Sequence, residues 1–561
     1  MSGYKSAVQN LRWWQRGVVY EIYVSSFKDT TGNGIGDLQG IIDKLDYLNG
    51  DSSTTSLGVD TIWLSPFYPS PMTDFGYDVA DYCNVNPLFG NLATFDRLVT
   101  EAHSRGIKII IDYVPNHTSD KHPWFVESRS SRHNARRDWY IWRDTKPDSG
   151  EIGSSRLPNN WGSYFGGPAW TFDEVTGQYY LHQFTKEQPE LNWRNPEIRE
   201  AMMDILRFWL DRGVDGLRID VIELLIKDAK LRDNPPNPDA ASCLLPNDIF
   251  GRQLHIYNHD QDDVHQVIRE IRRVIEDYDD RCIIGEVWAE LPRWVKYYGA
   301  SSTSSPGDEL HLPFNFRLMR VPWQAQEIRR TVDELETALP NFTWPNYVLG
   351  SHDMKRLATR IGGQAQARVA AMLLLTLRGT PTLYYGDELG LEDGVISPEK
   401  IKDPQGLNLG AERTRDICRT PMQWEAEPNA GFCPEQVEPW LTISDDYATR
   451  NVAVQSTDPT SILNLYRRLL ALRRSSPALQ GGSYCPLDGI PRECFVYMRE
   501  ADDERKLVSL NFSHTEQTIS LPHLASSAKV LLSTHIDCEE SIDLQCLRLR
   551  PDEGCIIGLD K

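Results

Sequence analysis

The sequence predicts an α/β fold, specifically a (β/α)8 barrel, on two observations. Short apolar runs typical of buried parallel strands alternate with amphipathic helical segments along most of the 561 residues, and eight runs are strand candidates. No glycine-rich nucleotide-binding fingerprint follows the first run, which disfavours an open, doubly wound sheet. Eight strands, most with a helix, fit a closed barrel better.

The first three strands are predicted at residues 18–24, 61–67 and 108–113, with helices at 38–48 and 92–105. From residue 115 to residue 182 the alternation stops. This segment is rich in Arg, Ser, Trp, Gly and Pro and has no sustained helical period. Because insertions are tolerated in surface loops, we expect a small irregular domain inserted after the third strand.

The alternation then resumes and continues to a late helix. Strands are predicted at 216–220, 282–287, 311–316, 347–351 and 381–385, and helices at 196–212, 264–278, 324–339, 368–377 and 462–474. After residue 475 short alternating runs predict a C-terminal antiparallel β domain. The predicted domains are the barrel at 1–114 and 183–475, the insertion at 115–182, and the β domain at 476–561.

Composition narrows the function classes. The net charge of −21 disfavours nucleic-acid and anionic-membrane partners. The 16 Trp and 23 Tyr suit sugar ligands, although most are expected in the core. No apolar run resembles a signal peptide or membrane span, and the ten Cys lack metal-ligand spacing. We therefore expect a cytoplasmic protein with reduced thiols.

Carboxylates follow several predicted strands, at the barrel end where active sites are built. They are Asp112, Asp220, Glu286 and Asp353, with His117 and His352 close behind. Their convergence is unfavourable by mutual repulsion, so it indicates a metal cage or acid–base chemistry. Arg218 lies on the same strand face as Asp220 and argues against a metal there. Paired carboxylates with aromatic neighbours suit glycosidic-bond cleavage.

Eight motifs then carry a family resemblance. They are Asp112-Tyr-Val-Pro-Asn-His117, Gly216-Leu-Arg-Ile-Asp220, Ile284-Gly-Glu286, His352-Asp353, Gln188-Pro-Glu-Leu-Asn192, Gly76-Tyr-Asp78, Arg415-Asp-Ile-Cys-Arg-Thr-Pro-Met-Gln-Trp424 and Gly379-Thr-Pro-Thr-Leu-Tyr-Tyr-Gly386. Along the chain these motifs follow the order of the α-amylase family of glycoside hydrolases, and they resemble its α-glucosidase and oligo-1,6-glucosidase branch. The matching segment spans almost the whole predicted barrel.

The resemblance implies three catalytic residues. Asp220 is the expected nucleophile of a retaining mechanism, and Glu286 the acid that protonates the leaving oxygen and then activates water. Asp353 is expected to bind and distort the cleaved glucose. Arg218 should hold Asp220 ionised, whereas apolar neighbours should raise the pKa of Glu286. Asp112 is expected to be a structural partner of Arg218.

The resemblance also implies substrate-binding residues. His117 and His352 resemble donors to sugar hydroxyls, and Tyr77 a stacking platform, with ordinary core packing as its alternative. Asp78 and Arg415 resemble the pair that clamps the non-reducing end of the sugar. Such a clamp closes the site beyond one glucose and implies an exo-acting enzyme.

A glycine-rich loop before the first predicted helix matches a calcium-type pattern. Its expected ligands are Asp29, Thr31, Asn33, the Ile35 carbonyl and Asp37. The family often has Asn at the position of Thr31. A structural Ca²⁺ is one reading of the loop, and a simple glycine-rich turn is the other. No organic cofactor is expected.

The expected function is hydrolysis of terminal α-linked glucose from isomaltose, maltose or sucrose through a covalent glucosyl-Asp220 intermediate. Val221, next to the nucleophile, resembles the residue found in α-1,6-preferring members. Ser351 replaces the usual Asn before His352, a change expected to tune activity only. The alternative is a transglucosylase or trehalose synthase-like isomerase using the same intermediate. A non-catalytic transporter subunit is disfavoured because the carboxylates are present and no span is found. The enzyme is expected to act as a monomer or homo-oligomer.

Overall fold

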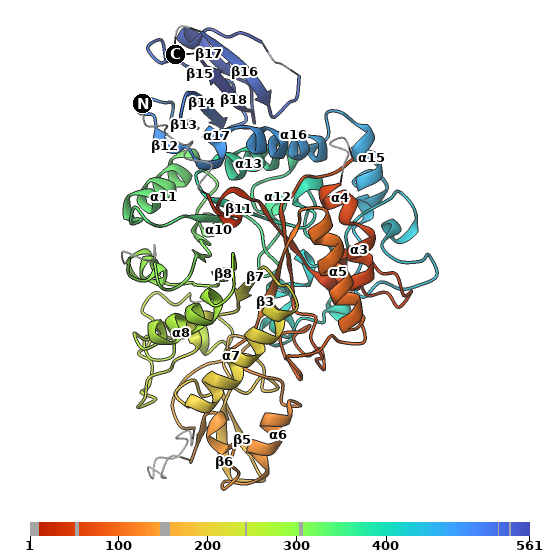
Figure 1. Ribbon diagram of the computed structural model, residues 1–561, viewed down its shortest axis with the longest axis vertical. Coiled ribbons are helices and arrows are strands. Elements are labelled where there is room, and N and C mark those ends of the chain that lie inside the picture. Colours follow the sequence, from red (N-terminus) through yellow and green to blue (C-terminus); the bar gives the residue numbers. More distant parts are fainter. Residues whose placement is uncertain are drawn as a thin grey trace.

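The computed structural model describes residues 11–50, 55–145, 157–241, 244–301, 307–525, 527–537 and 540–560. Eight parallel strands form its central sheet, in the order β10-β11-β1-β2-β3-β7-β8-β9, and curve into a barrel (Figure 1). They are β1 Val19–Ile22, β2 Thr61–Leu64, β3 Lys108–Tyr113, β7 Gly216–Ile219, β8 Cys282–Gly285, β9 Leu312–Pro313, β10 Asn346–Val348 and β11 Thr380–Tyr384. Within these described ranges no strand pairing joins β9 to β10. The predicted fold class is confirmed.

Helices surround the strands. The main ones are α3 Leu38–Asp43, α4 Leu45–Asn49, α5 Leu92–Ser104, α7 Pro196–Asp211, α8 Val264–Glu276, α11 Ala325–Ala338, α13 Gln364–Thr376 and α16 Ile462–Ser475. α8 buries Val264, Val267, Ile268 and Ile271, the spacing of one helix face. The helix predicted at 38–48 is divided at Lys44, whose ψ of 9° leaves the helical region. α13 begins earlier than predicted because Gly363, at φ 107°, ends the preceding turn.

Strand alternation creates two apolar cores. Inside the barrel, Val19, Trp63, Ile110 and Ile284 belong to one buried cluster. The residues between them point outward and pack under the helices in a much larger cluster. The next inward-facing positions, two residues nearer the C-terminal ends of the strands, are polar. Asp112 of β3 lies beside Arg218 of β7 there. The apolar inner core thus forms the floor of a polar site at the C-terminal ends of the strands.

The insertion after β3 is more regular than predicted. It contains α6 Pro123–Ser130 and a three-stranded antiparallel sheet, β4 Trp142–Arg143, β5 Trp170–Asp173 and β6 Gln178–Leu181, in the order β4-β6-β5. The bulky residues that break the helical period, including Trp142 and Tyr180, pack against Phe125 of α6. Figure 1 shows this unit at the opposite end of the molecule from the C-terminal sheet.

The C-terminal domain is an antiparallel β structure, as predicted. Its main sheet has the order β12-β13-β14-β18-β16, and a separate pair joins β15 to β17. The strands are β12 Ser483–Pro486, β13 Cys494–Ala501, β14 Glu504–Asn511, β15 Gln517–Ile519, β16 Ala528–Ser533, β17 Leu547–Leu549 and β18 Gly554–Leu559. Across the described residues, none of the helices combines the length and apolarity that crossing a membrane requires.

Candidate active site

Arg218 is the centre of the polar cluster above the barrel floor. Its Nη1 donates to Asp112 Oδ1 and to Asp220 Oδ1, each at 2.8 Å, and its Nη2 forms an ion pair with Glu286 Oε2. All four side chains are buried. β7 supplies Arg218, Asp220 directly follows β7, β3 supplies Asp112 from the adjacent strand, and Glu286 directly follows β8. The structure therefore brings both predicted catalytic carboxylates to one guanidinium.

Burial dominates the electrostatics of this cluster. It raises the pKa of Asp112 to about 6, against the opposing charge of Arg218. Burial also raises the pKa of Asp220 well above its ordinary value; Arg218 opposes this shift, whereas Glu286 and Asp112 add to it. The guanidinium limits these shifts but does not abolish them. Protonation of Asp112 is therefore expected near pH 6.

The environment of the Glu286 carboxyl is polar, not apolar as we predicted. Besides its ion pair with Arg218, its Oε1 accepts a hydrogen bond from the indole Nε1 of Trp288 at 2.7 Å. The backbone N–H of Val221 lies 3.3 Å from Oε2. Val221 itself adopts a left-handed conformation, φ 36° and ψ 47°, which is unfavourable for a β-branched residue. The carboxyl is thus oriented by three donors, from β7, from the turn after β7 and from the loop after β8.

Charge pairs around Arg415 line one end of the cavity, the Arg415 end. Its guanidinium contacts Asp74 Oδ1 at 2.9 Å, Asp403 Oδ1 at 2.7 Å and Asp353 Oδ1 at 3.1 Å. Asp353 also pairs with Arg419 at 3.1 Å. Burial alone would raise the pKa of Asp353, but the neighbouring His352, Arg415 and Arg419 lower it below its usual value.

The predicted partner of Arg415 was wrong. Asp78 is fully buried and accepts hydrogen bonds from Ser70 Oγ and from the backbone N–H of Thr73 and Asp74, so it holds the loop together. Asp74, four residues earlier, lines the cavity and pairs with Arg415. In a loop the direction of a side chain follows from the turn and not from a sequence period.

Tyr77 and His352 form a hydrogen-bonded pair on the cavity wall. The Tyr77 hydroxyl lies 2.8 Å from His352 Nε2 and donates to Asp112 Oδ2 at 3.0 Å, and the two rings stack. Burial lowers the pKa of His352 to about 3, so the ring is neutral near neutral pH. Its Nδ1 contacts Glu21 Oε1; burial raises the pKa of Glu21, which lets a protonated carboxyl donate to this nitrogen. Nε2–H then faces Tyr77.

His117 lies on the same wall. Gln188 Nε2 lies 3.1 Å from His117 Nε2 and donates to Asp74 Oδ2 at 3.0 Å. Burial lowers the pKa of His117 to about 3. Gln188 thus connects His117, a predicted sugar-binding residue, to Asp74 at the Arg415 end of the cavity.

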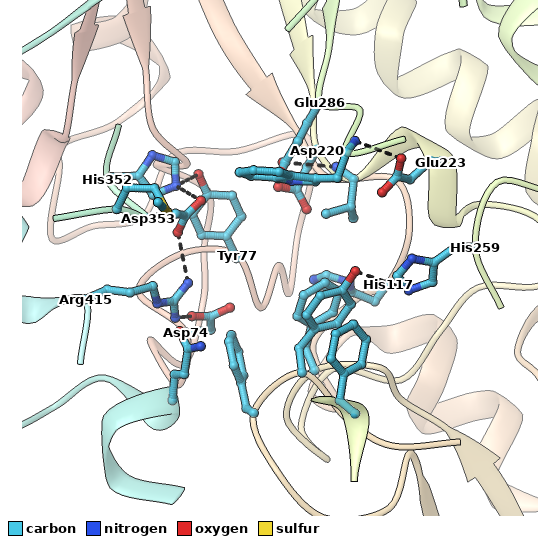
Figure 2. A pocket seen from close by; sticks show the side chains of 18 of the residues that line it. Asp74, Tyr77, His117, Asp220, Glu223, His259, Glu286, His352, Asp353 and Arg415 are labelled. Atoms are coloured by element: carbon cyan, nitrogen blue, oxygen red, sulfur yellow. Dashed lines mark hydrogen bonds and ion pairs between the residues drawn. The ribbon is translucent and has the colours of Figure 1, made fainter. Parts of the chain in front are cut away.

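The opposite side of the cavity is lined by residues from the insertion and from the loops after β7 and β8. The cavity has a volume of about 420 Å³, a size that suits a small ligand. Tyr164 stacks on Phe184 with 5.0 Å between ring centroids, whereas Phe165 lies at the Arg415 end, 4.7 Å from the Arg415 guanidinium. Figure 2 shows Glu223 on the far side of Asp220 and Glu286 from Arg415.

Sequence reasoning missed Asp74, Glu223 and the aromatic residues of the insertion. Glu223 carried a usable signal, because a carboxylate inside the apolar run 219–226 needs a polar partner. Asp74 and the aromatic residues lie in loops without periodicity, and nothing in the pattern indicates that they face the cavity.

The calcium-type loop is organised by its own backbone. Asp29 accepts from the N–H groups of Thr31, Gly32 and Gly34, and Asp37 accepts from those of Thr30 and Gly40. Nowhere in the described ranges do three His, Cys, Asp or Glu side chains gather as a metal cage. The available oxygens are those of two carboxylates, an amide, a hydroxyl and a carbonyl. The oxygen types are those that Ca²⁺ prefers, but most carboxylate lone pairs already accept these N–H groups and the hydroxyls of Thr30 and Thr31, so Ca²⁺ binding by the loop stays a prediction.

Comparisons with known proteins agree with this geometry. The family model "Alpha amylase, catalytic domain" matches residues 21–482. A probable alpha-glucosidase of Rhizobium meliloti (strain 1021) is 41% identical over 525 residues, 91% of each chain. An oligo-1,6-glucosidase of Parageobacillus thermoglucosidasius is 36% identical, covering 97% of this chain and 98% of its own. Among solved structures, the alpha-glucosyl transfer enzyme XgtA gives a TM-score of 0.88 at 38% identity, over 98% of this chain and 100% of that one.

Proposed function

Because the chain belongs to the α-amylase family of glycoside hydrolases, we propose that it is a retaining, exo-acting α-glucosidase of short α-glucosides. The observation that carries the proposal is the sharing of Arg218 by Asp220 and Glu286 beside the charge pairs of Arg415. Two carboxyls on one guanidinium suit the separation of about 5 Å used by retaining enzymes. Isomaltose, maltose and sucrose are the expected substrates.

In the proposed reaction Asp220 attacks the anomeric carbon of the terminal glucose. The bond to the leaving oxygen breaks while Glu286 gives that oxygen a proton, and a β-glucosyl ester on Asp220 results. Glu286 then takes a proton from water, which attacks the same carbon and releases glucose in the α configuration. Arg218 favours the ionised nucleophile, and Trp288 N–H orients the acid.

The exo mode of action is inferred from the Arg415 end. Asp74, Asp353 and Arg415 would bind the hydroxyls of the terminal glucose, and these ion-paired side chains would then block a further sugar unit. Tyr77 and the neutral rings of His117 and His352 would contact the same glucose from the wall. The enzyme should therefore release single glucose units.

Glucosyl transfer is the second candidate. It uses the same intermediate but passes glucose to a sugar, as a transglucosylase or isomerase does. The likeness to an alpha-glucosyl transfer enzyme and the aromatic contact of Tyr164 with Phe250 near Glu223 support it, since a drier acceptor side disfavours water.

Initial rates and products on maltose, isomaltose, sucrose and trehalose test both candidates. Release of α-glucose equal to substrate consumed supports hydrolysis, whereas new disaccharides or trisaccharides support transfer. If the D220N variant cleaves these sugars as fast as the wild-type enzyme, the proposal is wrong.

We further propose that the loop from Asp29 to Asp37 binds a structural Ca²⁺ through the oxygens named above. We also keep the cytoplasm as the expected location, supported by the buried thiols of Cys282, Cys418 and Cys433.

A further inference from the structure

Glu223 is a buried carboxyl in the half of the cavity that the proposed mechanism leaves unused. It lies on the loop after β7, three residues beyond Asp220, and only 2% of its surface is exposed. It lines the same cavity as the two proposed catalytic carboxyls. A carboxyl is costly to bury without hydrogen-bond partners, so its place here needs a reason.

Only one of its oxygens is satisfied by the protein. Oε2 accepts a hydrogen bond from the backbone N–H of Trp288 at 2.8 Å, which fixes the side chain (Figure 2). For Oε1, the part of the chain that the structure describes provides no donor. Because the residue lines the cavity, a group bound there can supply this partner.

The wall next to Glu223 is built to hold a ring. Trp288 stacks on Phe316 with 4.1 Å between ring centroids, and the Arg320 guanidinium lies 4.3 Å from the Trp288 ring. This layered wall is rigid and amphipathic. It can hold a sugar ring whose hydroxyls point toward Glu223.

The charge state of Glu223 fits this role. Burial raises its pKa to about 8; the Trp288 N–H opposes the shift, the nearby carboxylates of Asp260 and Glu286 add to it, and Arg320 opposes it. The phenols of Tyr164 and Tyr297 also interact with it and stay neutral at this pH. Near neutral pH the carboxyl is mostly protonated, so it can both donate to and accept from a hydroxyl.

We propose that Glu223 determines specificity on the leaving-group side by hydrogen-bonding a hydroxyl of the second sugar. The enzyme thereby favours polyhydroxylated leaving groups and acceptors over aryl ones. The inference rests on the proposed glucosidase function and deepens it. A sugar hydroxyl completes the hydrogen bonding of Glu223, whereas an aryl group leaves a buried polar atom unpaired.

The test compares kcat/KM for isomaltose and maltose with kcat/KM for p-nitrophenyl α-glucoside. In the E223L variant the disaccharide values should fall roughly 10- to 100-fold, the usual effect of losing a buried hydrogen bond to substrate. The p-nitrophenyl value should stay within about threefold, because that substrate offers Glu223 no hydroxyl. E223Q should retain the wild-type ratio within about threefold, since an amide also donates and accepts.

The matched control is E290L, the same change at an exposed carboxylate on the loop after β8 that does not line the cavity. It should leave both substrates unchanged. E223A repeats the measurement if E223L does not fold. An equal loss for disaccharides and the aryl glucoside, or no loss for either, overturns the inference. If the wild-type enzyme cleaves none of these substrates, the proposed function itself fails.

Discussion

The ion pair between Asp74 and Arg415 is predicted to fix the terminal glucose, and the D74N variant tests it. The two charged groups lie 2.9 Å apart with Asp74 only 3% exposed. At an effective dielectric constant of 20 this distance corresponds to about 6 kcal/mol of Coulomb attraction. Arg415 keeps Asp403 and Asp353 as partners, and desolvation offsets part of the attraction. The net loss should therefore be about 2–4 kcal/mol of transition-state stabilisation.

Such a loss lowers kcat/KM roughly 30- to 1000-fold, measured at pH 7.5 with p-nitrophenyl α-glucoside. D78N is the matched control, because within the described ranges Asp78 accepts hydrogen bonds only from its own loop. It should lower the melting temperature by a few degrees, as expected for a buried group left poorly paired, and change kcat/KM much less. If D74N keeps kcat/KM within threefold of the wild-type value, the assignment of this end as the glucose clamp is refuted.

Three further predictions follow from the site and the loop. V221A should lower the isomaltose-to-maltose ratio of kcat/KM about tenfold, the usual effect of removing methyl groups beside a bound substrate. An unchanged ratio would show that Val221 does not determine linkage preference. The acid limb of the kcat/KM–pH profile should have an apparent pKa near 6. Burial raises the pKa of Asp74 to about 6 and also raises the pKa of Asp220, and activity falls when either carboxylate gains a proton. An acid limb near pH 4 would contradict this. Chelation of the wild-type enzyme should lower its melting temperature by about 5 °C, and added Ca²⁺ should restore it. The melting temperature of D29N should not respond to chelator or Ca²⁺. If the melting temperature of the wild-type enzyme does not change on chelation, the loop is a simple turn without Ca²⁺.

The barrel could be predicted from sequence because its strands are apolar runs of fixed period. β3 and β7 lie within one residue of the predicted ranges. The expected pairing of Asp112 with Arg218 is present, since both face inward at adjacent positions of neighbouring strands. Parallel strands bring their C-terminal ends together, so the meeting of Asp220 and Glu286 also followed from the fold class.

The remaining features depend on contacts between distant segments. Val287 is a sequence neighbour of Glu286 and is apolar, but the carboxyl itself contacts Arg218 of the adjacent strand. Asp74 and Asp78 are both acidic residues of one loop, and only the turn between them decides which one meets Arg415. A sequence period carries no information about such turns.

The most direct test of the central claim is mass spectrometry of the enzyme after reaction with 5-fluoro-α-glucosyl fluoride, which forms the glucosyl ester faster than water removes it. The account predicts one added fluoroglucosyl group, on the peptide that contains Asp220, and none in D220N. Attachment to another residue would contradict it, as would turnover of α-glucosides without any covalent adduct.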